Sequence, residues 1–322
     1  MRRNVLIFHA GALGDFVLTW PLAMALGRLH PQSRIIYVVS AGKGALAEKA
    51  LGVEWTDGEA GWHRLYESDA AAPPGAKMLA ESHSIYTFVA ASGAAANDAS
   101  SPGDVWMNNI RRWAPGAKVV ALEARPPDGY GGLWGEFLID QLASMPAMAE
   151  SVRQMMVAVN QRGVRSGQCG PSNEARATGD VVIHGGAGSP RKCWPVERYI
   201  ELARRIKDQL GRSVRFVIGE VEQETWNRTK IESLATAGSI VGPATYVELM
   251  TTLSKAAGYV GNDSGPTHLA GIIGVATVAL FGPTDAAVWR PLGPRVECIS
   301  GWPMETIGVD AVFQKVSELL ER

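Results

Sequence analysis

Short apolar runs alternate with longer amphipathic stretches along almost the whole chain. In the first half, this pattern predicts strands over residues 4–9, 34–39, 84–90 and 117–122 and helices over 15–29, 43–51, 103–113 and 134–144. In the second half, it predicts strands over 180–184, 214–218, 257–261 and 275–280 and helices over 195–210, 222–236, 245–256 and 266–273. Regular alternation of strands and helices predicts an α/β protein with parallel sheets and right-handed crossovers.

The two halves begin alike, each with a buried strand that enters a Gly-rich turn. Residues 163–179, rich in Gly, Ser, Arg and Asn, show no periodicity and are expected to form a linker. A last amphipathic helix is predicted over 308–321. We therefore predict two Rossmann-like domains, residues 1–162 and 180–306, with the carboxyl ends of their sheets facing one interdomain cleft.

Composition narrows the class of protein without changing this fold. The chain has 322 residues, 46% of them apolar, and a net charge of −1. Residues 1–160 hold 13 Lys/Arg against 15 Asp/Glu, so neither this half nor the whole chain is expected to bind nucleic acid. The three scattered cysteines, Cys169, Cys193 and Cys298, fit neither a disulfide framework nor a zinc site. With no apolar stretch long enough for a transmembrane helix, we expect a cytoplasmic protein.

The first Gly-rich turn, Gly11-Ala-Leu-Gly14-Asp15, carries an acid where a helix begins. A carboxylate in this position repels phosphate, so the turn is not expected to hold a diphosphate. An ionised carboxylate that faces a cleft can accept a proton from an attacking hydroxyl. Aspartate also caps helices well, and the residues alone favour the cap.

The second turn runs from His184 to Pro195 and contains Ser189 and Lys192. Its small residues allow close approach of a ligand, and Lys192 offers a point charge for phosphate. The alternative is a surface loop with a solvated lysine. The segment is not a Walker loop, because the Gly-Lys-Ser/Thr ending is absent.

The third turn follows the strand at 257–261 and opens a helix whose free amides would form an anion site. Its candidate ligands are Asp263, Ser264, Gly265, Pro266, Thr267 and His268. A helix cap at Asp263 and a satisfied, partly buried His268 are the alternatives.

Two further residues follow strand ends in the same half. Glu222 suits the hydroxyls of a ribose, although a solvated helix start explains it as well. Thr284 lies in a Gly-Pro-Thr-Asp loop that turn chemistry alone explains. The chain has no Asp-x-Asp pair, which favours neutralisation of a diphosphate by Lys192 and helix dipoles over a metal ion.

Together these segments resemble glycosyltransferase family nine, the ADP-heptose:lipopolysaccharide heptosyltransferases, which have the GT-B fold. The resemblance is strong over roughly 180–290 and thin between 40 and 160. It implies an acceptor domain at 1–162, a donor domain at 180–306 and a final helix at 307–322 that crosses back to the first domain. It departs from the family's pattern at His184-Gly185, where the family usually has His-Pro.

The resemblance also implies roles for the residues. Asp15 would be the general base of a single inverting displacement, which raises this role above the cap. Lys192 and the helix start at Ser264–Thr267 would hold the diphosphate, and Glu222 would meet the ribose. No metal and no cofactor would be needed beyond the nucleotide diphosphate sugar, with ADP-heptose favoured. The acceptor would be a glycan or glycolipid, which leaves a peripheral membrane contact open.

Two other classes of protein use similar turns. An NAD-dependent oxidoreductase would need a Gly-x-Gly-x-x-Gly turn that neither half shows clearly, and Asp15 would oppose its pyrophosphate. A non-catalytic nucleotide-sugar binding protein would keep the donor residues, but an intact Asp15 argues against it.

Overall fold

The computed structural model describes residues 3–68, 71–89, 102–164, 172, 174–175 and 179–321. Most of the linker predicted over 163–179 lies outside this part of the chain. The chain divides into two compact units. Unit 1 comprises Met1–Tyr130 and Trp134–Met155, and unit 2 comprises Gly131–Leu133 and Met156–Arg322.

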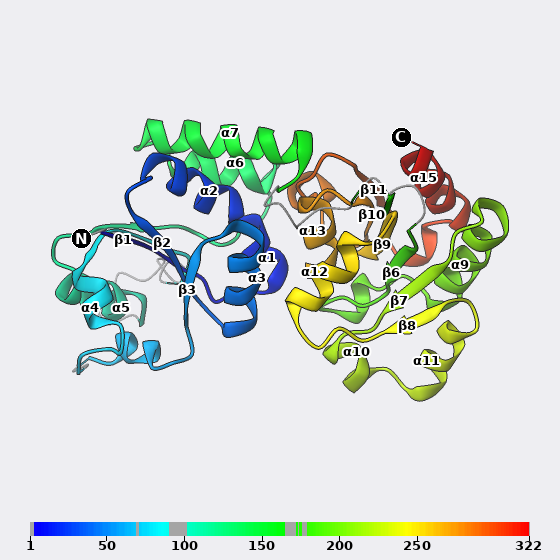
Figure 1. Cartoon of the computed structure of the whole chain (residues 1–322), viewed down its shortest axis with the longest axis horizontal. Helices are drawn as coiled ribbons and strands as arrows, with labels where there is room; N and C mark the ends of the chain where they lie inside the picture. Colours follow the sequence, from blue (N-terminus) through cyan, green and yellow to red (C-terminus); the bar gives the residue numbers. More distant parts are fainter. Residues whose placement is uncertain are drawn as a thin grey trace. The chain divides into compact units, whose positions relative to one another are not determined.

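Unit 1 is built on a parallel sheet of five strands in the order β3-β2-β1-β4-β5 (Figure 1). The strands are β1 (Asn4–Phe8), β2 (Arg34–Val39), β3 (Glu54–Asp57), β4 (Ser82–Thr87) and β5 (Lys118–Ala121). In the centre, Leu6 lies opposite Ile36 on one side and Ile85 on the other. Every residue of β1 is buried, as expected for a parallel strand covered on both faces.

Helices cover both faces of this sheet. They are α1 (Leu13–Leu18), α2 (Trp20–Leu29), α3 (Ala41–Leu51), α4 (Ala76–Ala80), α5 (Pro102–Trp113), α6 (Trp134–Gln141) and α7 (Pro146–Arg162), with a 3-10 turn η1 (Trp62–Tyr66). On one face, Phe8 packs edge-on against Trp62 and Trp106, with ring centroids 5.2 and 5.1 Å apart. Trp106 is therefore a core residue.

The single helix predicted over 15–29 is two helices that meet at Thr19. Pro21 falls in the first turn of α2 and has no N–H with which to continue a helix from α1. The hydroxyl of Thr19 instead donates to the carbonyl of Phe16 at 2.7 Å. The break lets α1 remain a short helix directly behind the first Gly-rich turn.

Unit 2 is built on a parallel sheet of six strands in the order β11-β10-β9-β6-β7-β8. The strands are β6 (Val181–His184), β7 (Val214–Val217), β8 (Ser239–Val241), β9 (Gly258–Asn262), β10 (Ala276–Phe281) and β11 (Val296–Ser300). The helices and 3-10 turns are η2 (Pro190–Lys192), α9 (Val196–Leu210), α10 (Glu220–Thr225), α11 (Arg228–Ala235), α12 (Tyr246–Ser254), α13 (Gly265–Ile272), α14 (Ala286–Trp289), η3 (Met304–Thr306) and α15 (Val309–Glu321). Both units thus have the predicted α/β architecture with parallel sheets.

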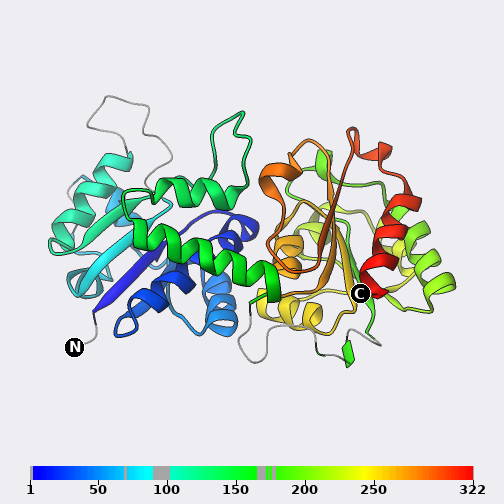
Figure 2. The same ribbon diagram turned by 90° about the horizontal axis from the view of Figure 1, so that it is seen from above.

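The last helix, α15, packs into the core of unit 2, whereas we had expected it to cross back to the first domain. Its apolar side, Val309, Val312, Val316 and Leu319, is buried in the same core cluster as the strand residues Val260 and Leu280. Figures 1 and 2 both show α15 in red beside α9. An apolar stripe at helical spacing predicts that a helix is buried on one side, but not which sheet it covers.

Candidate functional site

Three Gly-rich turns come together at the carboxyl edge of the sheet in unit 2. They follow β6, β9 and β10, which are neighbours in the sheet with β9 in the middle. The ends of parallel strands meet at one edge, so the predicted residues of these three turns are brought into contact.

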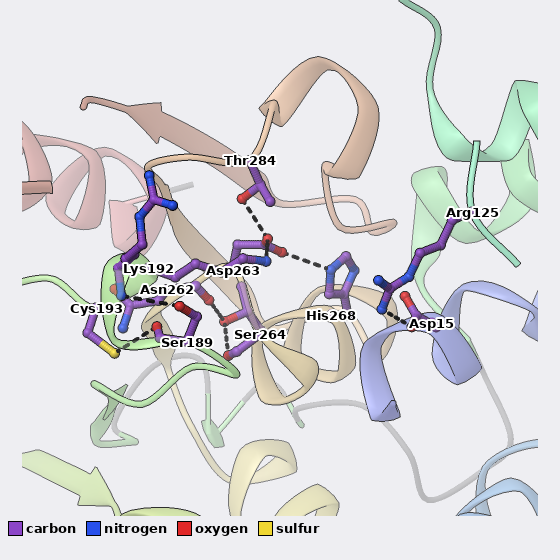
Figure 3. Close-up of polar contacts among 12 residues, drawn as sticks. Asp15, Arg125, Ser189, Lys192, Cys193, Asn262, Asp263, Ser264, His268 and Thr284 are labelled. Carbon is purple, nitrogen blue, oxygen red and sulfur yellow. Dashed lines mark hydrogen bonds and ion pairs between the residues drawn. The ribbon is translucent and has the colours of Figure 1, made fainter. Parts of the chain in front are cut away.

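Asp263, directly after β9, binds side chains from the turns on both sides of it (Figure 3). One carboxylate oxygen, Oδ2, accepts from Lys192 Nζ and from Thr284 Oγ1, each at 2.7 Å. The other, Oδ1, lies 3.4 Å from His268 Nε2. We call these four residues the Asp263 cluster. Asp263 is therefore not the helix cap that we considered as an alternative.

The carboxylate of Asp263 is buried with its partners and stays ionised. Burial alone would raise the pKa of Asp263, but hydrogen bonds and charge from His268 and Lys192 hold it well below its ordinary value. The side chain of Lys192 keeps 27% of its surface exposed, against 8% for Asp263. The ammonium group of Lys192 is thus held by the buried carboxylate of Asp263 and is still partly exposed to an anion from solvent.

Asn262, which the sequence analysis did not single out, joins the second turn to the third. Its Oδ1 accepts from the Trp194 amide at 3.0 Å and from the Tyr199 hydroxyl at 2.8 Å. Its Nδ2 donates to the carbonyls of Gly185 and Gly186 at 2.9 and 3.3 Å. The side chain is fully buried with all of these bonds made, so it fixes the backbone of the second turn.

The start of α13 keeps two backbone amides without a partner in the described part of the chain, those of Ser264 and Gly265. Ser264 is the N-cap, and Pro266 has no amide proton. The hydroxyl of Thr267 faces inward and donates to the Asn262 carbonyl at 2.5 Å. The helix start thus presents two amides without a partner, and the side chain of Thr267 belongs to the core.

Ser189 and Glu222 lie beside the second turn. Ser189 caps η2, and its hydroxyl accepts from the Arg191 amide at 3.4 Å. Glu222 is buried at 5% exposure, so the solvated helix start considered for it is wrong. Its Oε2 accepts from the Gly219 amide at 2.9 Å and lies 3.4 Å from His184 Nε2. These partners outweigh burial and lower the pKa of Glu222.

Asp15 lies in the first turn of α1 at the carboxyl edge of the sheet in unit 1. The N-cap of that helix is Ala12, and no side chain caps it, so Asp15 is not a cap. Its Oδ2 accepts from Arg125 Nη2 at 3.1 Å, drawn as a dashed line in Figure 3. The Asp15 side chain is 12% exposed and that of Arg125 is 69% exposed. The carboxylate of Asp15 is therefore bound by Arg125 and keeps a small part of its surface exposed.

A second cation, Lys43 of α3, lies under the same turn. Its Nζ donates to the carbonyl of Gly11 at 2.7 Å, and burial lowers its pKa while the carboxylates of Glu59 and Asp15 oppose that shift. A Cβ at Gly11 would stand 2.9 Å from His9 Cε1 and 3.3 Å from Asp15 Oδ2, so a side chain here would displace His9. Gly14 lies within α1 itself.

Sequence reasoning missed three residues that bind the predicted turns: Arg125 and Lys43 around Asp15, and Asn262 beside Asp263. Each is far in sequence from its partner, and although Asn262 lies inside the third turn, nothing in the local sequence shows that its side chain reaches the second turn. In the described residues, no three His, Cys, Asp or Glu side chains gather as they would to bind a metal ion. Cys193 and Cys298 are free thiols, and Cys169 lies outside those residues.

A comparison with protein families identifies the family of this chain. The profile of glycosyltransferase family 9 (heptosyltransferase) matches residues 140–315, which is more than half of the chain and includes the whole Asp263 cluster. This chain belongs to glycosyltransferase family 9. The resemblance stated above is confirmed.

Solved structures of family-9 proteins confirm the fold of this family-9 chain. A family-9 glycosyltransferase from Veillonella parvula is 16% identical, with a TM-score of 0.66 over 99% of this chain and 97% of that one. The Escherichia coli ADP-heptose heptosyltransferase II is 17% identical, with a TM-score of 0.67 over 100% and 99%. The Escherichia coli heptosyltransferase WaaC, solved with ADP, is 16% identical, with a TM-score of 0.65 over 98% and 99%. The chain therefore has the predicted GT-B fold.

A curated relative matches over a much shorter stretch. Lipopolysaccharide heptosyltransferase 3 of Escherichia coli is 36% identical over 53 residues, which is 16% of this chain and 16% of that protein. This family-9 chain thus aligns with only about a sixth of that relative's length. In the part of the chain that the structure describes, no helix is both long and apolar enough to cross a membrane.

Proposed function

We propose that this family-9 chain is an inverting glycosyltransferase that works without a metal ion. It moves a heptose-like sugar from an ADP-heptose type donor to a hydroxyl of a glycan or lipopolysaccharide-type acceptor. The observation that carries the proposal is the Asp263 cluster beside the open amides of α13. It combines an exposed ammonium group with a helix N-terminus, which together suit a diphosphate.

The donor is assigned to unit 2. The ammonium of Lys192 and the amides of Ser264 and Gly265 receive the diphosphate and stabilise it as it leaves. The hydroxyl of Ser189 adds a further donor, and Glu222 binds the ribose. ADP is preferred as the nucleotide because a family-9 relative, WaaC, has been solved with ADP and with ADP-2-deoxy-2-fluoro heptose.

The acceptor is assigned to unit 1. Asp15 accepts the proton of the attacking hydroxyl as the new glycosidic bond forms and the bond to the diphosphate breaks. One displacement from the opposite face inverts the anomeric carbon. Arg125 holds the carboxylate of Asp15 in one orientation, so the base need not be ordered during the reaction.

Calorimetry with ADP, UDP, GDP, CDP and NAD, each with and without a chelator, tests the donor assignment. We expect ADP to bind best and the chelator to have no effect. Replacing the charge in Lys192→Ala should weaken ADP binding about 10- to 100-fold, since a charge-assisted hydrogen bond contributes about 1.5–3 kcal/mol. Lys207→Ala on the exposed side of α9 is the matched control and should bind like the parent.

Other outcomes separate the remaining classes. Binding of NAD with no response to any diphosphate would replace the proposal with a dehydrogenase. ADP binding without any transfer to lipopolysaccharide acceptors would favour a nucleotide-sugar binding protein. Preference for another nucleoside diphosphate would retain a glycosyltransferase and exclude ADP-heptose.

A further inference from the structure

The Asp263 cluster and the start of α13 balance only part of the charge of a diphosphate. The ammonium of Lys192 and the carboxylate of Asp263 lie 2.7 Å apart, so their formal charges cancel at short range. The amides of Ser264 and Gly265 contribute only partial charges. A diphosphate is a multiply charged anion, and without a metal ion it requires another cation nearby.

Arg191 is the residue next to Lys192 in η2, and its side chain is exposed. None of the ion pairs found among the described residues includes Arg191. Its backbone is fixed on both sides. The Arg191 amide donates to Ser189 Oγ, and two residues after η2 the Trp194 amide donates to Asn262 Oδ1. The guanidinium is thus an uncompensated charge at a fixed point of the second turn.

The guanidinium of Arg191 is seated on an aromatic ring. Its Cζ lies 5.1 Å from the centre of the Trp302 ring, within the range of a cation–π contact. Trp302 follows β11 and is 50% exposed, which is unusual for a tryptophan in this chain. An indole surface in that position orders the arginine while leaving the edge of the guanidinium open to solvent.

Trp302 in turn lies beside the turn that follows β10. A Cβ added at Gly282 would touch Trp302 Cε3 at 3.4 Å and would collide with the sulfur of Met304. Two residues later, Thr284 binds Asp263, which binds Lys192. Lys192, Asp263 and Thr284 are thus joined by hydrogen bonds, and the ring that holds Arg191 lies beside the same turn as Thr284.

We propose that Arg191, ordered by Trp302, is a second cation for the diphosphate of the donor. This inference rests on the proposed function, and it adds a phosphate contact that the sequence analysis did not foresee. Lys192 meets one phosphate as a point charge, whereas the planar guanidinium of Arg191 offers paired N–H groups to two oxygens. Trp302 is a positioning residue, since it acts through Arg191.

Calorimetry of Arg191→Ala with ADP, AMP and adenosine tests the assignment. We expect roughly tenfold weaker binding of ADP, a smaller loss for AMP and no change for adenosine, because only the phosphates meet the guanidinium. Trp302→Ala should also weaken the binding of ADP most, that of AMP less and that of adenosine not at all. Trp302→Phe should retain most of the ADP affinity, because phenylalanine also presents a ring face. Increasing salt should weaken ADP binding more in the parent than in Arg191→Ala.

Arg204→Ala, an exposed arginine of α9, is the matched control and should bind all three ligands like the parent. Circular dichroism of each variant checks that the fold is retained. Unchanged ADP affinity in Arg191→Ala would overturn the inference while leaving the donor site intact. Equal losses for ADP and adenosine would also overturn it, because they would show a contact with the nucleoside. A parent protein that binds no ADP would instead refute the proposed function and this inference with it.

Discussion

Asn262 and Asp263 follow one another in the chain and have opposite environments. The side-chain amide of Asn262 is fully buried. Its N–H groups donate to two backbone carbonyls, and its oxygen accepts from one backbone amide and one hydroxyl. A carboxylate in that position would face the carbonyls of Gly185 and Gly186 and repel them. Asp263 is turned the other way, toward Lys192, where a negative charge is stabilised. The order of the two residues therefore decides which of them lies among backbone groups and which binds a cation.

His9 predicts how the stability of unit 1 depends on pH. It is buried with neither ring nitrogen hydrogen-bonded, and burial together with the charge of Lys43 lowers the pKa of His9 to about 3. An unfolded chain binds this proton at the ordinary pKa of about 6.5, so stability is lost as pH falls from about 6.5 towards 3, by at most about 1.4 kcal/mol per pH unit. In His9→Leu, urea unfolding should show a flatter dependence over that range. The exposed His63→Leu should retain the slope of the parent, and an unchanged slope in His9→Leu would contradict this account.

At this scale the sequence predicted residues whose chemistry stands out within a motif and missed residues whose role depends on a distant partner. Asp15 and Lys192 were found from the turns that contain them. Arg125 binds Asp15 from 110 residues away, and Asn262 contacts Gly185 across 77. Such pairs depend on which strands become neighbours, and a local pattern carries no information about that.

The hydrophobic pattern predicted all the central strands, and the three that it missed all end a sheet, although β5, which also ends one, was predicted. β1, β6, β9 and β10 are buried along their whole length, so they appear in the sequence as continuous apolar runs. β3, β8 and β11 end their sheets and are only partly buried. A strand with one neighbour does not need an apolar run, so its pattern is weak.

Helix boundaries were predicted less well where a cap interrupts an amphipathic stretch. The helix predicted over 222–236 is two helices, α10 and α11, that break at Trp226 and Asn227. The side chain of Asn227 accepts from the Lys230 amide at 2.8 Å and starts α11. The apolar periodicity continues through the break, which is why it predicted one helix.

The second turn predicts a sharp difference between two glycines. A Cβ at Gly186 would overlap the carboxylate of Glu222, whereas at Gly188 it would meet nothing within 4 Å. Gly186→Ala must therefore displace Glu222 from Gly219 and His184, and should lower the free energy of unfolding by about 1–3 kcal/mol and weaken ADP binding. Gly188→Ala should change the free energy of unfolding by less than about 0.5 kcal/mol. Thermal unfolding and calorimetry of the two variants provide the comparison, and equal effects would refute the packing described here.

Over the whole molecule, the candidate residues divide cleanly between the two units. Every residue assigned to the donor lies in unit 2, and Gly11, Gly14 and Asp15 lie in unit 1. The net charge of −1 conceals local differences, because Lys43 and Arg125 accompany Asp15 in a half with more acidic than basic residues. A charge count by segment therefore predicted the absence of a large basic surface but not the cations beside Asp15.

This division predicts where ADP protects the protein from hydrogen exchange. Amides in residues 185–192, 262–268 and 282–284 should exchange more slowly with ADP bound, because ligand contacts and the fixed turns suppress local opening. AMP should protect the same turns less. Protection confined to residues 9–15 would place the nucleotide in unit 1 and contradict the donor assignment.

The central claim is tested most directly by the turnover of Asp15→Asn with an ADP-heptose donor and a lipopolysaccharide acceptor. Asparagine keeps the shape of the side chain but cannot accept a proton, so the account predicts that kcat falls at least about 100-fold while the Kd for ADP stays within about twofold of the parent. The exposed Asp140→Asn should transfer sugar like the parent. If Asp15→Asn transferred the sugar at the rate of the parent, Asp15 would not be the base, and the mechanism proposed for this chain would be wrong.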